Sequence, residues 1–166
     1  MTTNQQLLTT FYQSFQRKDY KAMQNCYADN AVFNDEVFIS LNASEVKAMW
    51  EMFCIKGKDL RIDFSNLHAD EKNGNAEWTA AYTFSKTNRK VINHIKANFS
   101  FENGKILRHT DHFNFYNWSC QALGLTGVLL GWTSFVKNKV RKEGMKNLSD
   151  FMNKKNKFDS KNLRTL

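Results

Sequence analysis

The sequence predicts an α+β fold, in which three helices pack into the hollow of a curved sheet. Two observations lead to this class. Apolar residues recur at helical spacing in three segments of the first 57 residues, and residues 60–115 change to the alternation of apolar and polar residues that is typical of strands. Helices that come first and an antiparallel meander that follows indicate an α+β architecture.

The helices are predicted from their apolar stripes. Residues 4–17 form the first stripe, a shorter one begins at Tyr20 and ends near residues 29–30, and a third begins at Ser44 and ends near Gly57. Between the second and third helices, residues 31–38 are predicted as a strand that places Phe33 and Asp35 on the same face.

The meander is predicted as four strands, over residues 60–70, 76–85, 91–101 and 105–115. Asn73-Gly74 and Asn103-Gly104 are typical hairpin turns, and residues 86–90 form a polar turn without glycine.

Composition limits the classes of function. The 166 residues, 42% of them hydrophobic, suffice for one domain with a core. We expect neither a signal peptide nor a membrane span. Cys26, Cys54 and Cys120 are few and widely spaced, which favours reduced thiols in the cytoplasm.

The net charge of +8 is a feature of the C-terminus. Residues 137–166 contain 10 Lys or Arg and 3 Asp or Glu, whereas residues 1–136 contain 14 and 13. We therefore expect a solvated helix face and tail, and no nucleic-acid partner. Attraction to an anionic membrane surface or to a polyanion is the alternative.

The last predicted strand carries the strongest chemical signal. Alternation places Leu107, His109, Asp111, Phe113 and Phe115 on one face, and Ile106 and Arg108 on the other. A carboxylate and an imidazole on an apolar face are costly to desolvate unless they pair, and perturbed titration of such groups marks functional sites. The alternative is a structural pair whose polar atoms are satisfied by backbone groups.

Asp35 is a second candidate, because it lies between Phe33 and Val37 and so points inward in the predicted strand. A turn or cap role is the alternative, since Asn34-Asp35-Glu36 is a polar interruption. Aromatic strand and helix faces predict an apolar ligand pocket around these groups, although plain core packing explains such residues too. The predicted lining is Phe11, Phe15, Phe33, Trp50, Phe53, Trp78, Tyr82, Phe99, Phe113 and Trp118.

The sequence contains no motif that is typical of metal binding or nucleotide chemistry. His109 and His112 are three positions apart on one strand and face opposite sides, and neither a CxxC nor an HExxH motif occurs. We expect no metal and no organic cofactor.

The segment FYQSFQRKDYKAMQNCYADNAVFNDEVF resembles the opening of the nuclear transport factor 2-like superfamily, which includes ketosteroid isomerase, limonene epoxide hydrolase and SnoaL-like polyketide cyclases. GKILRHTDHFNF resembles the closing strand of the SnoaL-like branch, and WSCQALGLTGVLLGWTSFVKNKVR resembles the tail of a bacterial subgroup of it. The resemblance implies a cone of three helices over a strongly bent, mixed sheet with an internal pocket. It also implies a homodimer through the convex face of the sheet.

The resemblance assigns roles by position. It implies that Asp111 is a general base, with His109 as partner or acid and Asp35 as a second carboxylate. Phe11 stands where the isomerase has its oxyanion-hole tyrosine, and Lys96 and Ala97 stand near its protonated aspartate, so steroid isomerisation is not implied. Residues 77–83 lack the Arg-x-Asp pair of the epoxide hydrolase.

The C-terminal third is predicted as an extension of this cone. We expect a cone over residues 1–116, an extension over 117–153 that packs on it within the same domain, and a basic flexible tail over 154–166. Residues 116–135 are predicted to form a short helix, a glycine-hinged turn and an apolar segment that covers the cone mouth, before a helix over 134–153. In the alternative, Leu129, Leu130, Trp132 and Phe135 insert into a membrane surface.

The functional hypothesis is a cytoplasmic, SnoaL-like protein that binds a small hydrophobic molecule. Cofactor-free isomerisation, cyclisation, hydration or hydrolysis by proton transfer is the chemistry it predicts. Two alternatives stay open: a non-catalytic ligand-binding or interaction module on the same fold, and a peripheral membrane protein.

Overall fold

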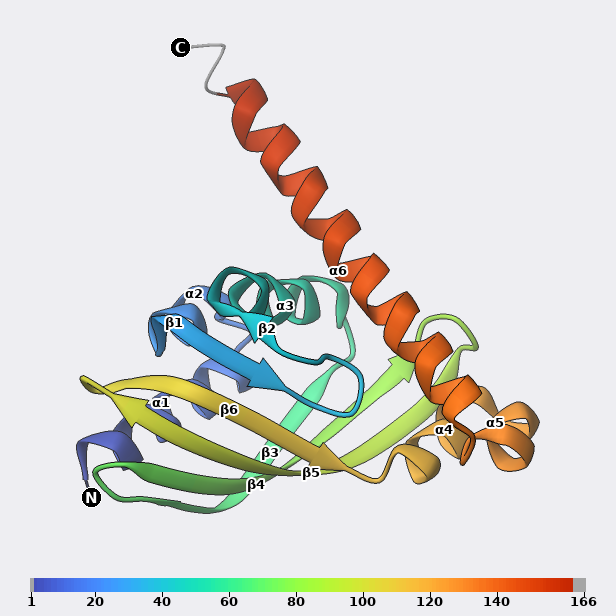
Figure 1. Cartoon of the computed structure of the whole chain (residues 1–166), viewed down its shortest axis with the longest axis horizontal. Helices are drawn as coiled ribbons and strands as arrows, with labels where there is room; N and C mark the ends of the chain where they lie inside the picture. The colour runs from blue at the N-terminus through green and yellow to red at the C-terminus, as the bar shows by residue number, and fades with distance from the viewer. Residues whose placement is uncertain (1, 163–166) are drawn as a thin grey trace.

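The strands form one six-stranded mixed sheet in the order β2-β1-β6-β5-β4-β3. A computed structural model describes residues 2–162 of the chain. β1 lies parallel to β6, and the other neighbouring strands are antiparallel. The meander bends strongly, so that the sheet has a concave face (Figure 1). The strands are β1 (Tyr27–Asn34), β2 (Leu41–Asn42), β3 (Arg61–Ala69), β4 (Asn73–Phe84), β5 (Arg89–Glu102) and β6 (Lys105–Phe113).

Three helices lie on the concave face, as predicted: α1 (Thr3–Gln16), α2 (Tyr20–Asn25) and α3 (Ala43–Lys56). Each begins at a polar residue whose side chain accepts a backbone N–H of the first turn, namely Thr2, Asp19 and Asn42. Their apolar stripes bury large side chains against the sheet, and Trp50 of α3 lies at the centre of this core.

The chain continues into α4 (Phe115–Leu123), α5 (Leu125–Leu130) and α6 (Ser134–Asn162). Phe115 and Trp118 of α4 form a second apolar cluster with Val91 of β5 and Val136 of α6. α6 passes α3, where Leu148 is buried and Lys155 pairs with the buried Glu51 at 2.6 Å, and then projects from the molecule (Figure 1). Within residues 2–162, no helix is long and apolar enough to cross a membrane.

α5 does not cover the cone mouth as we expected. α4 and the start of α6 pack on the cone, but Leu129, Leu130, Trp132 and Phe135 point outward. The tight contact between α5 and α4 turns them away: a Cβ added at Gly127 or Gly131 meets Ser119 at 1.9 Å.

Two turns differ from the prediction because side chains compete for the backbone. β1 ends at Asn34, four residues before the predicted end, because the Asp35 carboxylate accepts the N–H groups of Val37 and Phe38 and closes a turn. Asp70 makes the same kind of turn, so Asn73 and Gly74 belong to β4 rather than to a hairpin turn.

The face assignment of β6 is wrong at its first residues. Ile106 is buried, whereas Leu107 is half-buried. The pairing of β6 with β5 shifts between Ile106 and Arg108, which makes Leu107 an extra residue in a bulge. From His109 onward the predicted alternation holds.

Candidate functional site

β6 places His109 and Asp111 on the concave face, in the interior. His109 lies opposite Phe99 of β5 and Phe33 of β1, and Asp111 lies opposite the small side chain of Ala97. The side chains are 0% and 3% exposed, respectively. The prediction that these two polar groups share a face with apolar neighbours therefore agrees with the structure.

A chain of hydrogen bonds runs through the buried core and ends at Asp111. Trp50 Nε1 donates to Tyr27 Oη at 2.9 Å, Tyr27 Oη lies 2.6 Å from His109 Nδ1, and His109 Nε2 lies 3.0 Å from Asp111 Oδ1. The hydrogen bonds of His109 and Asp111 thus come from side chains rather than from backbone groups.

The order of donors in this chain assigns the protons. Tyr27 Oη accepts from Trp50, and its other partner among the described residues is His109 Nδ1, to which we assign the hydroxyl proton. Nδ1 is then the acceptor, and the imidazole carries its proton on Nε2, directed at Asp111. Burial raises the pKa of Tyr27 well above its usual value, which keeps its proton in place.

The two oxygens of Asp111 have different surroundings. Oδ1 accepts from His109 Nε2 and also from Trp78 Nε1 at 3.3 Å. Among the described residues no hydrogen bond reaches Oδ2. One oxygen is therefore held in place, and the other is available to a further donor.

Tyr12 of α1 supplies a polar group that sequence reasoning missed. Its hydroxyl is buried and has no hydrogen-bond partner among the described residues. Its ring stacks on Phe64 at 5.2 Å and lies 6.3 Å from Trp78, which itself contacts Asp111. Burial raises the pKa of Tyr12 well above its usual value, and the negative charge of Asp111 adds to the effect. The available signal was a single hydroxyl in an otherwise apolar helix stripe.

Asp35 takes the turn role that the sequence left open. Its Oδ1 holds the backbone of Val37 and Phe38, and no hydrogen bond joins it to Asp111. Burial raises the pKa of Asp35 from 3.8 to about 7, against the lowering effect of the two backbone N–H groups. The negative charge of Asp111 raises the pKa of Asp35 further. Burial is the largest cause of the raised pKa of Tyr82, and the charge of Asp35 adds to it.

The ten residues predicted to line the pocket are either buried or half-buried. Rings pack closely around His109, with centroids of Phe99 at 4.2 Å and Phe33 at 5.0 Å. Trp118 Nε1 of α4 donates to Tyr82 Oη at 2.8 Å and so ties the extension to β4. Buried residues are Phe11, Phe15, Phe33, Trp50, Phe99 and Trp118, and half-buried ones are Phe53, Trp78, Tyr82 and Phe113.

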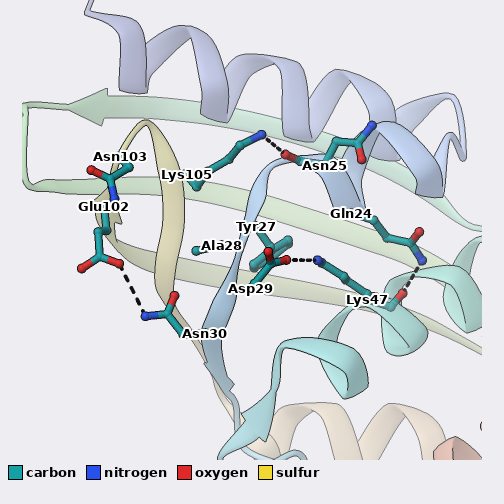
Figure 2. A pocket seen from close by; sticks show the side chains of 10 residues that line it. All are labelled: Gln24, Asn25, Tyr27, Ala28, Asp29, Asn30, Lys47, Glu102, Asn103 and Lys105. Carbon is teal, nitrogen blue, oxygen red and sulfur yellow. Dashed lines mark hydrogen bonds and ion pairs between the residues drawn. The ribbon is translucent and has the colours of Figure 1, made fainter.

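A hollow of about 390 Å³ lies on the outside of the molecule, between the end of α2, β1 and the β5–β6 turn. Its walls are polar and bonded to one another, as with Asp29 and Lys47 at 3.1 Å (Figure 2). Tyr27 lines this hollow, and its hydroxyl lies 2.6 Å from His109 Nδ1 in the core. A second hollow, of about 330 Å³, lies over β3, β4 and β5. The first hollow lacks the apolar character that we expected of the ligand site, and the second combines Phe64, Trp78 and Ile95 with polar and charged side chains.

The family model of the SnoaL-like domain matches residues 8–109, which include every strand up to His109 of β6. The chain belongs to the SnoaL-like domain family. No curated protein matches this SnoaL-like chain.

Solved structures share the SnoaL-like fold at low sequence identity. A proposed polyketide cyclase from Xanthomonas campestris pv. campestris is similar with a TM-score of 0.61 and 16% identity, over 72% of this chain and 96% of that one. An LEH-like epoxide hydrolase from M. tuberculosis gives a TM-score of 0.59 and 16% identity, over 76% and 95%. A protein with a ketosteroid isomerase-like fold from Catenulispora acidiphila, in complex with trimethylamine, gives 0.63 and 9%, over 76% and 96%.

Proposed function

We propose that this SnoaL-like protein binds a small hydrophobic molecule carrying one polar group, and that Asp111 moves a proton on it. The observation that supports the proposal is two neighbouring polar groups, one on β6 and one on α1, that no other described side chain uses. Asp111 Oδ2 lacks a hydrogen-bond donor among the described residues, and the buried Tyr12 hydroxyl lacks a partner. A buried polar group without a partner calls for an explanation, and a ligand hydroxyl or carbonyl supplies one.

In this proposal each residue has a role in the reaction. Asp111 Oδ2 accepts the proton, while the Nε2–H of His109 and the Nε1–H of Trp78 hold Oδ1. Tyr12 donates to the oxygen on which negative charge develops. Tyr27 and Trp50 fix the His109 tautomer and act as positioning residues. Isomerisation, cyclisation and hydration or hydrolysis all use such a base and donor.

A non-catalytic module on the same fold is the second candidate. Its support is the closed interior: Asp111 is 3% exposed and aromatic rings surround His109. In this case the chain of hydrogen bonds only specifies the packing of the core.

Binding of 2-naphthol, an apolar double ring with one hydroxyl, separates the candidates. We expect saturable binding to the wild type, weakened about tenfold or more by Asp111→Asn and about fivefold by Tyr12→Phe, since each change removes one hydrogen bond to the ligand. His112→Gln changes an exposed residue on the same strand and serves as the control. Absence of binding to the wild type, or equal binding by all variants that melt like it, contradicts the proposal and favours the second candidate.

Three further expectations remain proposals. A homodimer through the convex face of the sheet predicts twice the chain mass in sedimentation equilibrium. Cytoplasmic location predicts that a protease added to intact cells does not cleave the protein. Separation of the chain into a cone (1–116), an extension (117–153) and a flexible tail (154–166) predicts proteolysis first in the tail; residues 163–166 of that tail lie outside the described residues.

A further inference from the structure

The corner of the molecule formed by α5 and the start of α6 exposes an apolar surface, which we call the tip. Its six large side chains are between 46% and 81% exposed. Figure 1 shows α5 at the outer end of the molecule, with no other described element beyond it. Contiguous exposed apolar surfaces of this kind mark interaction sites. The tip consists of Leu125, Val128, Leu129, Leu130, Trp132 and Phe135.

The polar groups of the tip are satisfied within the tip itself. The carbonyls at the end of a helix lack intrahelical donors, and here side chains supply them. Trp132 Nε1 donates to Leu129 O at 3.1 Å, Thr133 Oγ1 to Leu130 O at 2.6 Å, and Tyr116 Oη to Val128 O at 3.1 Å. A helix end in water has no need of such bonds, whereas one that leaves water loses several kcal/mol for each unsatisfied group, on the order of 2–7.

The tip is held rigidly rather than loosely attached. Gly127 and Gly131 are buried against Ser119 of α4, with no room for a side chain. This contact keeps the apolar side chains turned outward, where they do not collapse onto the cone. Their exposure is therefore a property of the fold.

Charge around the tip is one-sided. Residues 114–136 contain no charged side chain, and basic residues follow at once in α6. Lys139 and Lys142 are exposed and make no ion pair with the described residues. The guanidinium of Arg89 adds a third positive charge beside Gly124, at the base of α5.

We propose that the tip docks onto the surface of an anionic lipid bilayer. Trp132, Phe135 and the leucines enter the interface, and Lys139, Lys142 and Arg89 contact lipid headgroups. A second copy of the chain is the weaker candidate partner, because a symmetric contact through the tip would bring these positive charges together. The proposal does not depend on a ligand site in the cone.

Co-sedimentation with vesicles tests the proposal on the whole chain. We expect the wild type to partition at least about tenfold more strongly onto phosphatidylcholine vesicles that contain phosphatidylglycerol than onto phosphatidylcholine alone. Trp132→Ser combined with Phe135→Ser lowers partitioning about tenfold or more. Lys139→Glu combined with Lys142→Glu lowers it on the anionic vesicles. Ile92→Ser removes an exposed apolar residue from β5 and is the matched control.

A second measurement uses the wild type alone. Trp132 is exposed, whereas Trp50 and Trp118 are buried and Trp78 is half-buried. Acrylamide quenching of tryptophan fluorescence should therefore fall when anionic vesicles are added. Unchanged quenching, or equal partitioning of the Trp132 and Phe135 variant and the wild type, overturns the proposal. So does a dimer in sedimentation equilibrium that the same variant abolishes, without vesicle binding.

Discussion

Replacing Asp35 by Asn should stabilise the protein at alkaline pH. The folded state raises the pKa of this carboxyl from 3.8 to about 7, chiefly by burial. The folded protein therefore holds the proton more tightly than the unfolded chain does. The stability contributed by Asp35 is greatest below about pH 4, and it is lost as the pH rises through about 7.

The size of the stability change follows from the change in the pKa of Asp35. About three pKa units at about 1.4 kcal/mol each set an upper limit of about 4 kcal/mol on the cost of ionisation. The side chain is partly exposed, and a neutral amide accepts the N–H groups of Val37 and Phe38 less strongly than a carboxylate. We therefore expect a net gain of about 1–2 kcal/mol at about pH 8, or about 2–8 °C in Tm.

Urea unfolding at about pH 5 and about pH 8 measures this effect. Asp63→Asn, at an exposed position on β3, controls for the general change in charge. The gain from Asp35→Asn should be clear at the higher pH and small or reversed at the lower one. Equal destabilisation at both pH values would show that the turn needs the carboxylate more than the core resists its charge.

Three further predictions test the packing. Tyr27→Phe leaves Trp50 Nε1 and His109 Nδ1 without their buried partner and should cost about 2–4 kcal/mol in chemical denaturation; a loss near zero contradicts the chain of hydrogen bonds. Gly127→Ala places a Cβ 1.9 Å from Ser119 O and should cost at least about 2 kcal/mol, whereas Gly104→Ala, in open space at φ +69°, should cost about 1–2; thermal melts that rank them in reverse refute the contact. Leu148→Ala should lower the free energy of unfolding by about 2–4 kcal/mol and speed hydrogen exchange in α6. No change in either would contradict the packing of this helix on the cone.

The order of helices and strands was predictable because it depends on local periodicity. Each apolar stripe and each alternating run requires one buried face, and that requirement is visible in the chain itself. The inward direction of His109 and Asp111 followed from the same rule. The rule failed at Leu107, because a bulge adds a residue that no periodicity records.

The hydrogen-bond partners of the candidate site were not predictable in this way. Tyr27 meets His109 only because β1 pairs with β6 across more than 70 residues, and Trp50 reaches Tyr27 from α3. Asp35 illustrates a local failure: its carboxylate competes for backbone N–H groups, so the strand ends before it. The outward direction of Trp132 was not predictable either, because hydrophobicity alone does not say what an apolar side chain contacts.

The hydrogen bond between Trp118 and Tyr82 joins two parts of the molecule that have separate proposed roles. α4 touches β4 through this bond and contacts α5 through Ser119. A short helix fixed at both ends links the tip to the wall of the core, so loss of the bond between Trp118 and Tyr82 should loosen both attachments of α4.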